Sequence, residues 1–198
     1  MKELGVKAST RGLYQWRPGI QEHYSASSNY LAGAEAAVGT NAQWAGDFTY
    51  VRTAKGWLFH AVVMDLFSRR IVGWSFSRHR NAELTMSALR MALADRQVSS
   101  GCLFHSDQGT EYAAREYTEL VESAGLQRSM SRRGQPRDNA AVESYFGSMK
   151  AELAHQAAFV DQIDATAQIM AYIELYNRER LHTSLNFKSP VEYERLCA

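Results

Sequence analysis

The amino-acid sequence predicts an α/β fold in which helices flank a mixed five-stranded sheet, with extra helices at the C-terminal end. Three strand-like runs at 44–52, 57–66 and 71–76 are joined by short turns, which is the pattern of an antiparallel meander. Helix-like and strand-like segments then alternate as far as about residue 150. A meander that leads into such alternation packs most simply as a mixed sheet covered by helices.

The segments after the meander are defined by their periodicity and their end signals. Asn81 has a side chain suited to an N-cap, so a helix is expected from there to about Arg96. A strand at 102–106, a helix at about 113–123 that stops at Gly125, and a short strand at 126–130 follow. The first of these helices is expected to bury one face, made of Leu84, Ala88, Met91 and Ala92.

The last third of the chain is predicted to be mainly helical. A basic loop at 131–138 precedes a helix at about 139–150, and a short final helix follows Pro190. An amphipathic helix is predicted between them, with its apolar face made of Ile163, Ala167, Met170, Ile173 and Tyr176. One aromatic set at strand spacing is predicted to be core: Trp57, Phe59, Phe67, Trp74 and Phe76.

Composition is that of an ordinary globular protein. With 198 residues, 45% apolar and 22% charged, the chain fits one large domain, or one domain with extensions. Residues 1–40 lack periodicity and are interpreted as an N-terminal extension or the remnant of a preceding module. The formal charge of +1 is no overall basic signature, so any nucleic-acid contact must come from local charge. Cys102 and Cys197 offer neither a disulfide framework nor metal-ligand spacing, and no run suits a signal peptide or a membrane span, so a cytosolic compartment is expected.

Three acidic side chains stand where a catalytic site would need them. Asp107 directly follows an apolar strand and precedes a Gln–Gly turn, which places its carboxylate at the carboxyl edge of the sheet. Asp47 lies inside the first strand-like run, and Glu143 lies on the helix after the basic loop. If the first and fourth strands are neighbours, Asp47 and Asp107 come close enough to raise each other's pKa unless a cation lies between them.

Carboxylates in such a cluster suit Mg²⁺ or Mn²⁺ better than zinc. Two such ions held about 3.5–4 Å apart catalyse in-line phosphoryl transfer. The alternative is that each acid is separately a surface residue, an N-cap or an ion-pair partner. The strand–strand–helix context of the three acids favours the shared site over that alternative.

The residues around these acids resemble the catalytic core of insertion-sequence transposases of the DDE class, in the group similar to retroviral integrases. The resemblance is carried by Trp44-x-x-Asp47-x-Thr-Tyr50, His105-Ser-Asp107-x-Gly and Asp138-Asn-Ala-x-x-Glu143-Ser-x-Phe-x-x-x-Lys150. It continues through Tyr176-Asn-x-x-Arg180-x-His182-x-x-Leu185 and Ser189-Pro-x-x-Tyr193, and so covers about residues 42–196. The 35 residues between Asp107 and Glu143 also match the spacing of that family.

The resemblance implies an RNase H-like fold, with an integrase catalytic core at 41–156 and a C-terminal helical part at 157–198. The implied activity is DNA strand cleavage and strand transfer that depends on Mg²⁺, with Mn²⁺ as a substitute. Asp47, Asp107 and Glu143 would be the catalytic metal ligands. The implied partners are DNA, at element ends and at the target, and further copies of the chain on paired ends, with no membrane and with nucleoid association when DNA is bound.

Relatives carry an end-recognising helix-turn-helix region ahead of the core, whereas only about 40 unpatterned residues precede Trp44. A shortened chain, a remnant, or a separate recognition protein or module is therefore expected. Two rival functions stay open beside strand transfer. One is an RNase H-like nuclease that only hydrolyses. The other is a degenerate core that serves as a DNA-binding or oligomerisation module, against which the presence of all three acids argues.

Four cations are expected to contact DNA phosphates. Lys150 lies two helical turns after Glu143, so both side chains share one face of the helix. Arg132, Arg133 and Arg137 lie in the basic loop just before that helix. The alternatives are a solvated helix lysine and a loop that merely improves solubility.

Other polar residues near the motifs have more than one reading. Asn139 is expected first to cap its helix. His105 is either a strand histidine with a satisfied hydrogen bond, which is favoured, or a group that tunes the site. Tyr176 is expected to pack the last long helix on the core, whereas Arg178 and Arg180 either pack or reach DNA.

Overall fold

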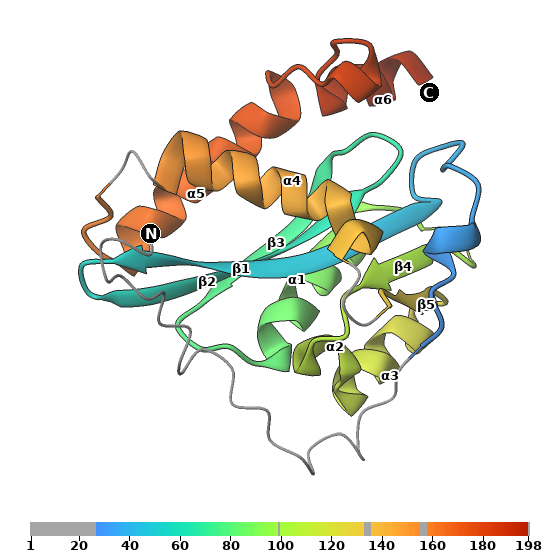
Figure 1. Ribbon diagram of the computed structural model, residues 1–198, viewed down its shortest axis with the longest axis horizontal. Coiled ribbons are helices and arrows are strands. Elements are labelled where there is room, and N and C mark those ends of the chain that lie inside the picture. The colour runs from blue at the N-terminus through green and yellow to red at the C-terminus, as the bar shows by residue number, and fades with distance from the viewer. Residues whose placement is uncertain (1–26, 99, 133–135, 155–157, 198) are drawn as a thin grey trace, which may run out of the picture.

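The computed structural model describes residues 27–98, 100–132, 136–154 and 158–197. These residues form a five-stranded sheet in the order β3-β2-β1-β4-β5, with helices on both faces (Figure 1). Antiparallel pairing joins β1 (Gln43–Thr53), β2 (Gly56–Asp65) and β3 (Ile71–Ser77). Parallel pairing then adds β4 (Leu103–Ser106) to β1 and β5 (Gln127–Met130) to β4. The mixed five-stranded sheet and the meander predicted from the sequence are confirmed.

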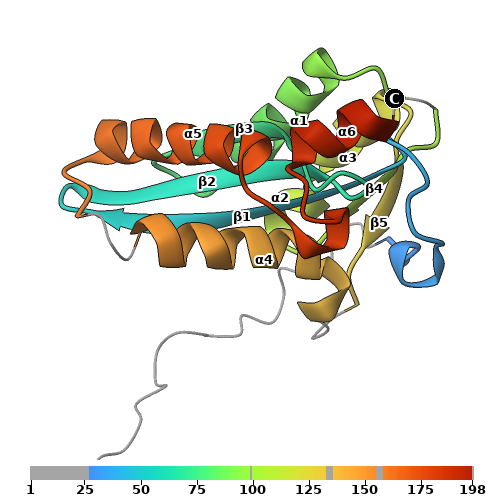
Figure 2. The same ribbon diagram turned by 90° about the horizontal axis from the view of Figure 1, so that it is seen from above.

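Two helical layers cover the sheet. One face carries α1 (Ala82–Asp95), α2 (Thr110–Ala113) and α3 (Arg115–Ser123), whereas α4 (Ala140–Met149) and α5 (Gln162–Arg178) lie side by side over the other face (Figure 2). A π-helical segment, η4 (Lys150–Ala154), extends α4, and a 3₁₀ turn, η3 (Pro136–Asn139), precedes it. Each face of the sheet has its own apolar cluster, so the core consists of two layers separated by the strands.

Local signals explain several of these elements. The Oδ1 atom of Asn81 accepts a hydrogen bond from the backbone N–H of Leu84 at 3.1 Å, so the predicted N-cap of α1 is confirmed. The helix then packs closely on β3, because Gly73 leaves no side chain between them. A Cβ atom at position 73 would lie 2.2 Å from the carbonyl oxygen of Ala88. The final helix, α6 (Pro190–Cys197), is held near the β2–β3 turn by Glu194, which accepts hydrogen bonds from Ser68, Arg70 and Arg96.

The predicted buried face of the long C-terminal helix is only partly correct. Ile163 is 75% exposed and Met170 is 47% exposed, although Ile173 and Tyr176 are buried as predicted. The buried side chains of α5 are Ala165, Ile169, Tyr172, Ile173, Tyr176 and Asn177. The helix offers two adjacent apolar stripes, and the one that contains Tyr172 is buried because its ring meets Tyr145 on α4, with centroids 6.2 Å apart.

Two smaller expectations also need correction. The helix predicted at about 113–123 corresponds to α3, but the sequence did not predict the short helix α2, which begins at Thr110 and is separated from α3 by a break at Ala114. Trp57 is 45% exposed and is not core, because it stands at the solvent-facing start of β2. There its ring meets Tyr50 edge-on, at a centroid distance of 5.2 Å. Within the described ranges, no helix combines the length and the apolar character needed to cross a bilayer.

Candidate active site

Two of the predicted acids lie at equivalent positions in the register of two neighbouring parallel strands, with Asp47 inside β1 and Asp107 one residue past the end of β4. The register of β1 and β4 pairs Trp44 with Phe104 and Ala45 with His105. Asp47 and Asp107 each follow two residues later, so the same register places them next to each other and on the same side of the sheet. That side is the one covered by α4, because Ala45 packs in the apolar cluster that contains Val142 of α4.

The backbone around each carboxylate holds one of its oxygens. The Oδ1 atom of Asp47 accepts a hydrogen bond from the N–H of Phe48 at 2.8 Å, and Oδ1 of Asp107 accepts one from the N–H of Gly109, also at 2.8 Å. Within the described part of the chain, neither Oδ2 atom has a hydrogen-bond partner. Gly46 leaves room for the ring of Phe104 on the neighbouring strand β4, since a Cβ atom at position 46 would lie 2.6 Å from that ring.

Electrostatics show that the two carboxylates repel each other. Burial, and then the charge of Asp107, raise the pKa of Asp47 to about 7. Glu143 also raises this pKa, whereas the N–H of Phe48 and the ammonium of Lys150 lower it. Burial also raises the pKa of Asp107, helped by Glu111 and opposed by the N–H of Gly109 and by Arg80. The site is therefore short of positive charge.

The third acid comes from the helix above the sheet. Four side chains of α4 pack on the sheet: Val142, Tyr145, Phe146 and Met149. Glu143 lies on the flank toward Asp47, whose pKa it influences, and it is exposed. It forms no hydrogen bond or ion pair with any other described residue, so its carboxylate is free to turn toward the acids on the strands.

The cap expected at the start of α4 has a different geometry. Asn139 occupies the N-cap position, but its side chain makes no capping hydrogen bond. Its Nδ2 atom instead donates to the carbonyl oxygen of Gly46 at 3.4 Å, next to Asp47. The capping expectation is therefore wrong for the side chain. The amide ties the beginning of α4 to β1 and so sets how closely Glu143 can approach the two aspartates.

These residues fit a divalent metal ion by their chemistry. The donors are carboxylate oxygens, the Oδ2 atoms of both aspartates have no partner among the described residues, and the two aspartates need a cation to offset their mutual repulsion. In the described ranges, no three His, Cys, Asp or Glu side chains are gathered closely enough to hold a metal ion. The structure thus brings Asp47 and Asp107 together and places Glu143 near them, without closing the three into one ligand set.

An ion pair beside Asp107 was not predicted from the sequence. Glu111 is only 5% exposed, and Arg80 donates to both of its carboxylate oxygens through Nε and Nη2. The guanidinium of Arg80 also lies 5.0 Å from the ring centroid of Phe48, next to Asp47. No local pattern links positions 80 and 111, since only the packing of the loop before α1 against α2 brings them together.

The predicted DNA-contacting cations have different surroundings. Lys150 lies beside the acids, with Nζ 5.4 Å from the ring centroid of Tyr50, and burial lowers its pKa while Asp47 opposes that effect. Arg132 forms an ion pair with Asp138, with Nη2 3.1 Å from Oδ1. Arg133 lies outside the described residues. Arg137 falls within η3, and its side chain also lies outside what the structure describes.

His105 is a satisfied strand histidine, as favoured from the sequence. Its ring nitrogens lie 2.9 Å from the hydroxyl of Ser129 and 3.0 Å from that of Ser131. Burial lowers its pKa to about 4, so the imidazole is neutral at physiological pH. Its two hydrogen bonds join β4 to Ser129 of β5 and to Ser131, which directly follows β5.

Comparison with known proteins places this arrangement in a family. Residues 37–136 match one integrase core domain family, and residues 124–190 match a second family that is also described as an integrase core domain. A transposase for insertion sequence element IS904 from Lactococcus lactis subsp. lactis is 40% identical over 160 residues, which are 80% of this chain and 63% of that protein. Transposase InsF for insertion sequence IS3A from Escherichia coli K12 is 41% identical over 169 residues, 85% of this chain and 59% of that protein.

Solved structures agree on the fold. The catalytic core domain of HTLV-2 integrase in complex with magnesium has a TM-score of 0.63 at 18% identity, over 79% of this chain and 98% of that one. A chain of the simian T-cell lymphotropic virus intasome in complex with a PP2A regulatory subunit has a TM-score of 0.70 at 16% identity, over 87% of this chain and 60% of that one. The present chain spans about three fifths of the length of the curated transposases that it matches. The protein has the RNase H-like fold of those cores and belongs to the integrase core domain family.

Proposed function

We propose that this chain is the catalytic core of a DDE transposase that cleaves DNA strands and transfers them in the presence of Mg²⁺. The observation that carries the proposal is the placement of Asp47 and Asp107 at matching positions of adjacent parallel strands, under a helix that presents Glu143. The names of the curated relatives, which are insertion-sequence transposases, support the same reading.

The residues have distinct parts in the proposed reaction. When bound, divalent cations supply the positive charge that activates the attacking oxygen and stabilises the leaving one. Asp47 and Asp107 would hold them through their unpartnered Oδ2 atoms, and the exposed Glu143 would close the site from α4. Lys150, beside Asp47, would hold a DNA phosphate next to the acids.

The chemistry then needs no covalent protein intermediate. A water molecule attacks a phosphodiester at the element end and frees a 3′-hydroxyl, which attacks a second phosphodiester in the target. Arg132, Arg133 and Arg137, just before α4, would contact the backbone of the same DNA. For Arg132 that contact requires exchange of Asp138 for a phosphate, and the 62% exposure of its side chain makes such an exchange feasible.

The organisation and partners of the protein are part of the same proposal. We divide the chain into an extension at 1–40, the catalytic core at 41–156 and a helical part of the core at 157–198. The last division is supported by α5, which packs in the same apolar cluster as α4. We propose that the substrate is DNA, at the element ends and at the target, and that several copies of the chain act together on paired ends. A separate protein or module would recognise the ends. The protein would lie in the bacterial cytoplasm, at the nucleoid when DNA is bound.

The test is a cleavage and strand-transfer assay with labelled element-end DNA and Mg²⁺. Asp107→Asn and Glu143→Gln are each expected to lower the rate at least about a hundredfold, because each removes a carboxylate from the proposed metal site. Asp95→Asn, an exposed carboxylate at the end of α1, is the matched control and should keep full activity. Retained activity in Asp107→Asn would refute the assignment.

A second substrate separates strand transfer from the rival functions. DNA that already carries a free 3′-hydroxyl at the element end bypasses the first cleavage. Joined product from this substrate establishes strand transfer, whereas cleavage without joining on any substrate would indicate a nuclease that only hydrolyses. DNA binding without either reaction, and without stabilisation by Mg²⁺, would indicate a binding or oligomerisation module.

A further inference from the structure

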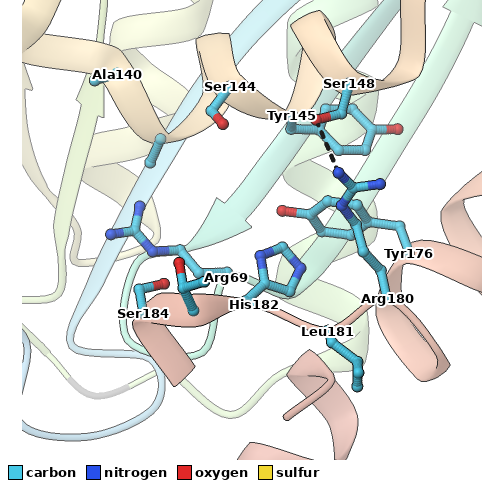
Figure 3. Close-up of a pocket in the computed structure, with 12 residues that line it drawn as sticks. Arg69, Ala140, Ser144, Tyr145, Ser148, Tyr176, Arg180, Leu181, His182 and Ser184 are labelled. Atoms are coloured by element: carbon cyan, nitrogen blue, oxygen red, sulfur yellow. Dashed lines mark hydrogen bonds between the residues drawn. The ribbon is translucent and has the colours of Figure 1, made fainter. Parts of the chain in front are cut away.

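A polar cavity lies on the flank of α4 opposite the acids. It has a volume of about 430 Å³ and is bounded by α4, by the β2–β3 turn and by the segment that follows α5. Figure 3 shows Arg69, Arg180 and His182 on one side of it and Ser144 and Ser148 of α4 on the other. None of these five residues belongs to the acidic site.

The cavity carries positive charge from two arginines, of which only Arg180 is paired with an acid among the described residues. The guanidinium of Arg69 is half-buried and forms no ion pair or side-chain hydrogen bond with any residue in the described part of the chain. Arg180 donates to Glu152 and, at 3.2 Å, to the hydroxyl of Ser148. Both guanidiniums act on His182, whose pKa is lowered first by burial and then by Arg180 and Arg69. A group of negative charge would therefore be attracted into the cavity.

The segment after α5 holds His182 rigidly toward this space. Its backbone pairs with Lys188, with the N–H of His182 donating to that carbonyl at 3.1 Å, and its ring meets Tyr176 edge-on with centroids 4.9 Å apart. The Nε2 atom of His182 is nevertheless buried without a hydrogen-bond partner among the described residues. A buried polar atom without a partner costs about 1–3 kcal/mol, so a ligand that supplies one is favoured.

The donor set suits a phosphate. Guanidinium, imidazole and hydroxyl groups all donate to phosphate oxygens, and an arginine fork matches two of those oxygens at once. Two hydroxyls, those of Ser144 and Ser148, line the same wall and can complete the oxygen coordination. An apolar ligand would leave these donors unpaired, which argues against one.

The geometry of α4 connects this cavity with the acidic site. At 100° per residue, Glu143 and Lys150 lie on one flank of the helix, and Ser144 and Ser148 lie on the other. The exposed ridge between the two flanks carries only Ala140, Gly147 and Ala151. A Cβ atom at Gly147 would meet nothing within 4 Å, so the described residues leave room for a phosphate backbone to cross the helix there.

We propose that the cavity formed by Arg69, Arg180, His182, Ser144 and Ser148 binds a phosphate of the DNA backbone while the acids act on the same DNA. This inference rests on the proposed function, which supplies the DNA. A helix is about 10–12 Å across with its side chains, and successive base pairs rise about 3.4 Å, so the bound phosphate lies roughly three nucleotides from the scissile one.

The test measures DNA affinity in EDTA, where no cleavage can occur, by fluorescence anisotropy of a short labelled duplex. Arg69→Gln is expected to weaken binding about five- to tenfold and to lower the slope of log K against log salt by about 0.9, the value for one lost phosphate contact. Arg115→Gln removes the same charge from α3, on the other face of the sheet, where the side chain is 86% exposed. It should change the affinity less than about twofold.

A second pair of variants leaves the turn that contains Arg69 unchanged, so a folding defect in that turn cannot explain their result. Ser144→Asp puts a negative charge into the cavity from an exposed position on α4, and Ser123→Asp puts the same charge on α3. Ser144→Asp should weaken binding more than Ser123→Asp, with thermal melting unchanged in both. Equal effects within each pair would overturn the proposal.

Two further outcomes are informative. If inorganic phosphate stabilises the wild type but not Arg69→Gln, while DNA affinity is the same in both proteins, the cavity is a free-phosphate site and the proposal fails. If Arg69→Gln loses DNA affinity although the wild type neither cleaves nor joins DNA, the cavity assignment stands and the catalytic proposal fails. Binding and catalysis are thus judged by separate measurements.

Discussion

Replacement of Asp47 by asparagine is expected to make the metal-free protein more stable at alkaline pH while abolishing its activity. Burial and the neighbouring charge of Asp107 raise the pKa of Asp47 from 3.8 to about 7. As the pH rises through this interval, the unfolded chain loses the Asp47 proton before the folded protein does. The folded state therefore loses stability between these two values, and the whole loss is present above pH 7. Asparagine carries no charge at any pH, so the Asp47→Asn protein does not lose this stability.

The magnitude follows from the same pKa. One unit of difference between the folded and unfolded pKa corresponds to 1.36 kcal/mol, so the interval from 3.8 to about 7 corresponds to at most about 4 kcal/mol. Because the carboxylate is near the surface, water and side-chain relaxation reduce this value. We expect Asp47→Asn to exceed the wild type by about 1–3 kcal/mol at about pH 8, and by less than about 1 kcal/mol at about pH 5.

The assay is urea denaturation of both proteins in EDTA at the two pH values, with Asp95→Asn as control. It removes the same charge at an exposed position at the end of α1, so the effect specific to Asp47 is the difference between the two variants. Addition of Mg²⁺ at about pH 8 should then stabilise the wild type, by about 2.7 kcal/mol at a hundredfold excess over Kd, and should leave Asp47→Asn unchanged. Equal destabilisation of Asp47→Asn at both pH values, or a wild type indifferent to Mg²⁺, would refute the reasoning.

Three further predictions concern the scaffold around the site. Arg80→Gln leaves the buried Glu111 without its bidentate partner and should lower the free energy of unfolding in urea by about 1–3 kcal/mol. The Arg80→Gln/Glu111→Gln double variant should recover part of that loss. A single variant as stable as the wild type would contradict this. Gly73→Ala places a Cβ atom 2.2 Å from the carbonyl oxygen of Ala88, so the free energy of unfolding should fall by more than about 2 kcal/mol. An unchanged melting temperature would disprove the close packing of α1 on β3. Burial lowers the pKa of His60 from 6.5 to about 4, so the free energy of unfolding should fall by up to about 3 kcal/mol as the pH drops through that interval and the unfolded chain takes up a proton. His60→Phe should therefore flatten the pH dependence of the urea midpoint. An unchanged pH dependence would count against a neutral buried His60.

The local sequence was sufficient for most of the fold and for the choice of the acids. Short apolar runs bounded by turn residues predict the strands, because a buried strand and a tight turn each depend on few neighbouring residues. Asn81 was identified as a cap for the same reason. Asp107 stood out because an acid that directly follows a buried strand has few structural uses. Glu143 was selected from its place on the helix after the basic loop, and the family resemblance then supported grouping it with the two aspartates.

Residues whose role depends on distant packing were misjudged or missed. Asn139 has the right residue type for a cap, yet its amide bonds to Gly46 because α4 lies directly over β1. The apolar stripe of α5 was placed wrongly, because the helix carries two stripes and only the position of Tyr145 decides between them. The Arg80–Glu111 pair had no sequence signal at all.

By itself, the sequence determined the order of the strands and helices and the chemical character of the acidic residues, since both arise from side chains within a few positions of one another. The tertiary structure decided which of those residues meet. Parallel pairing of β1 with β4 puts Asp47 beside Asp107, and the docking of α4 separates an acidic flank from the cavity that contains Arg69 and His182. Such contacts join positions far apart in the chain, and they form only when burial of both apolar layers brings the elements together.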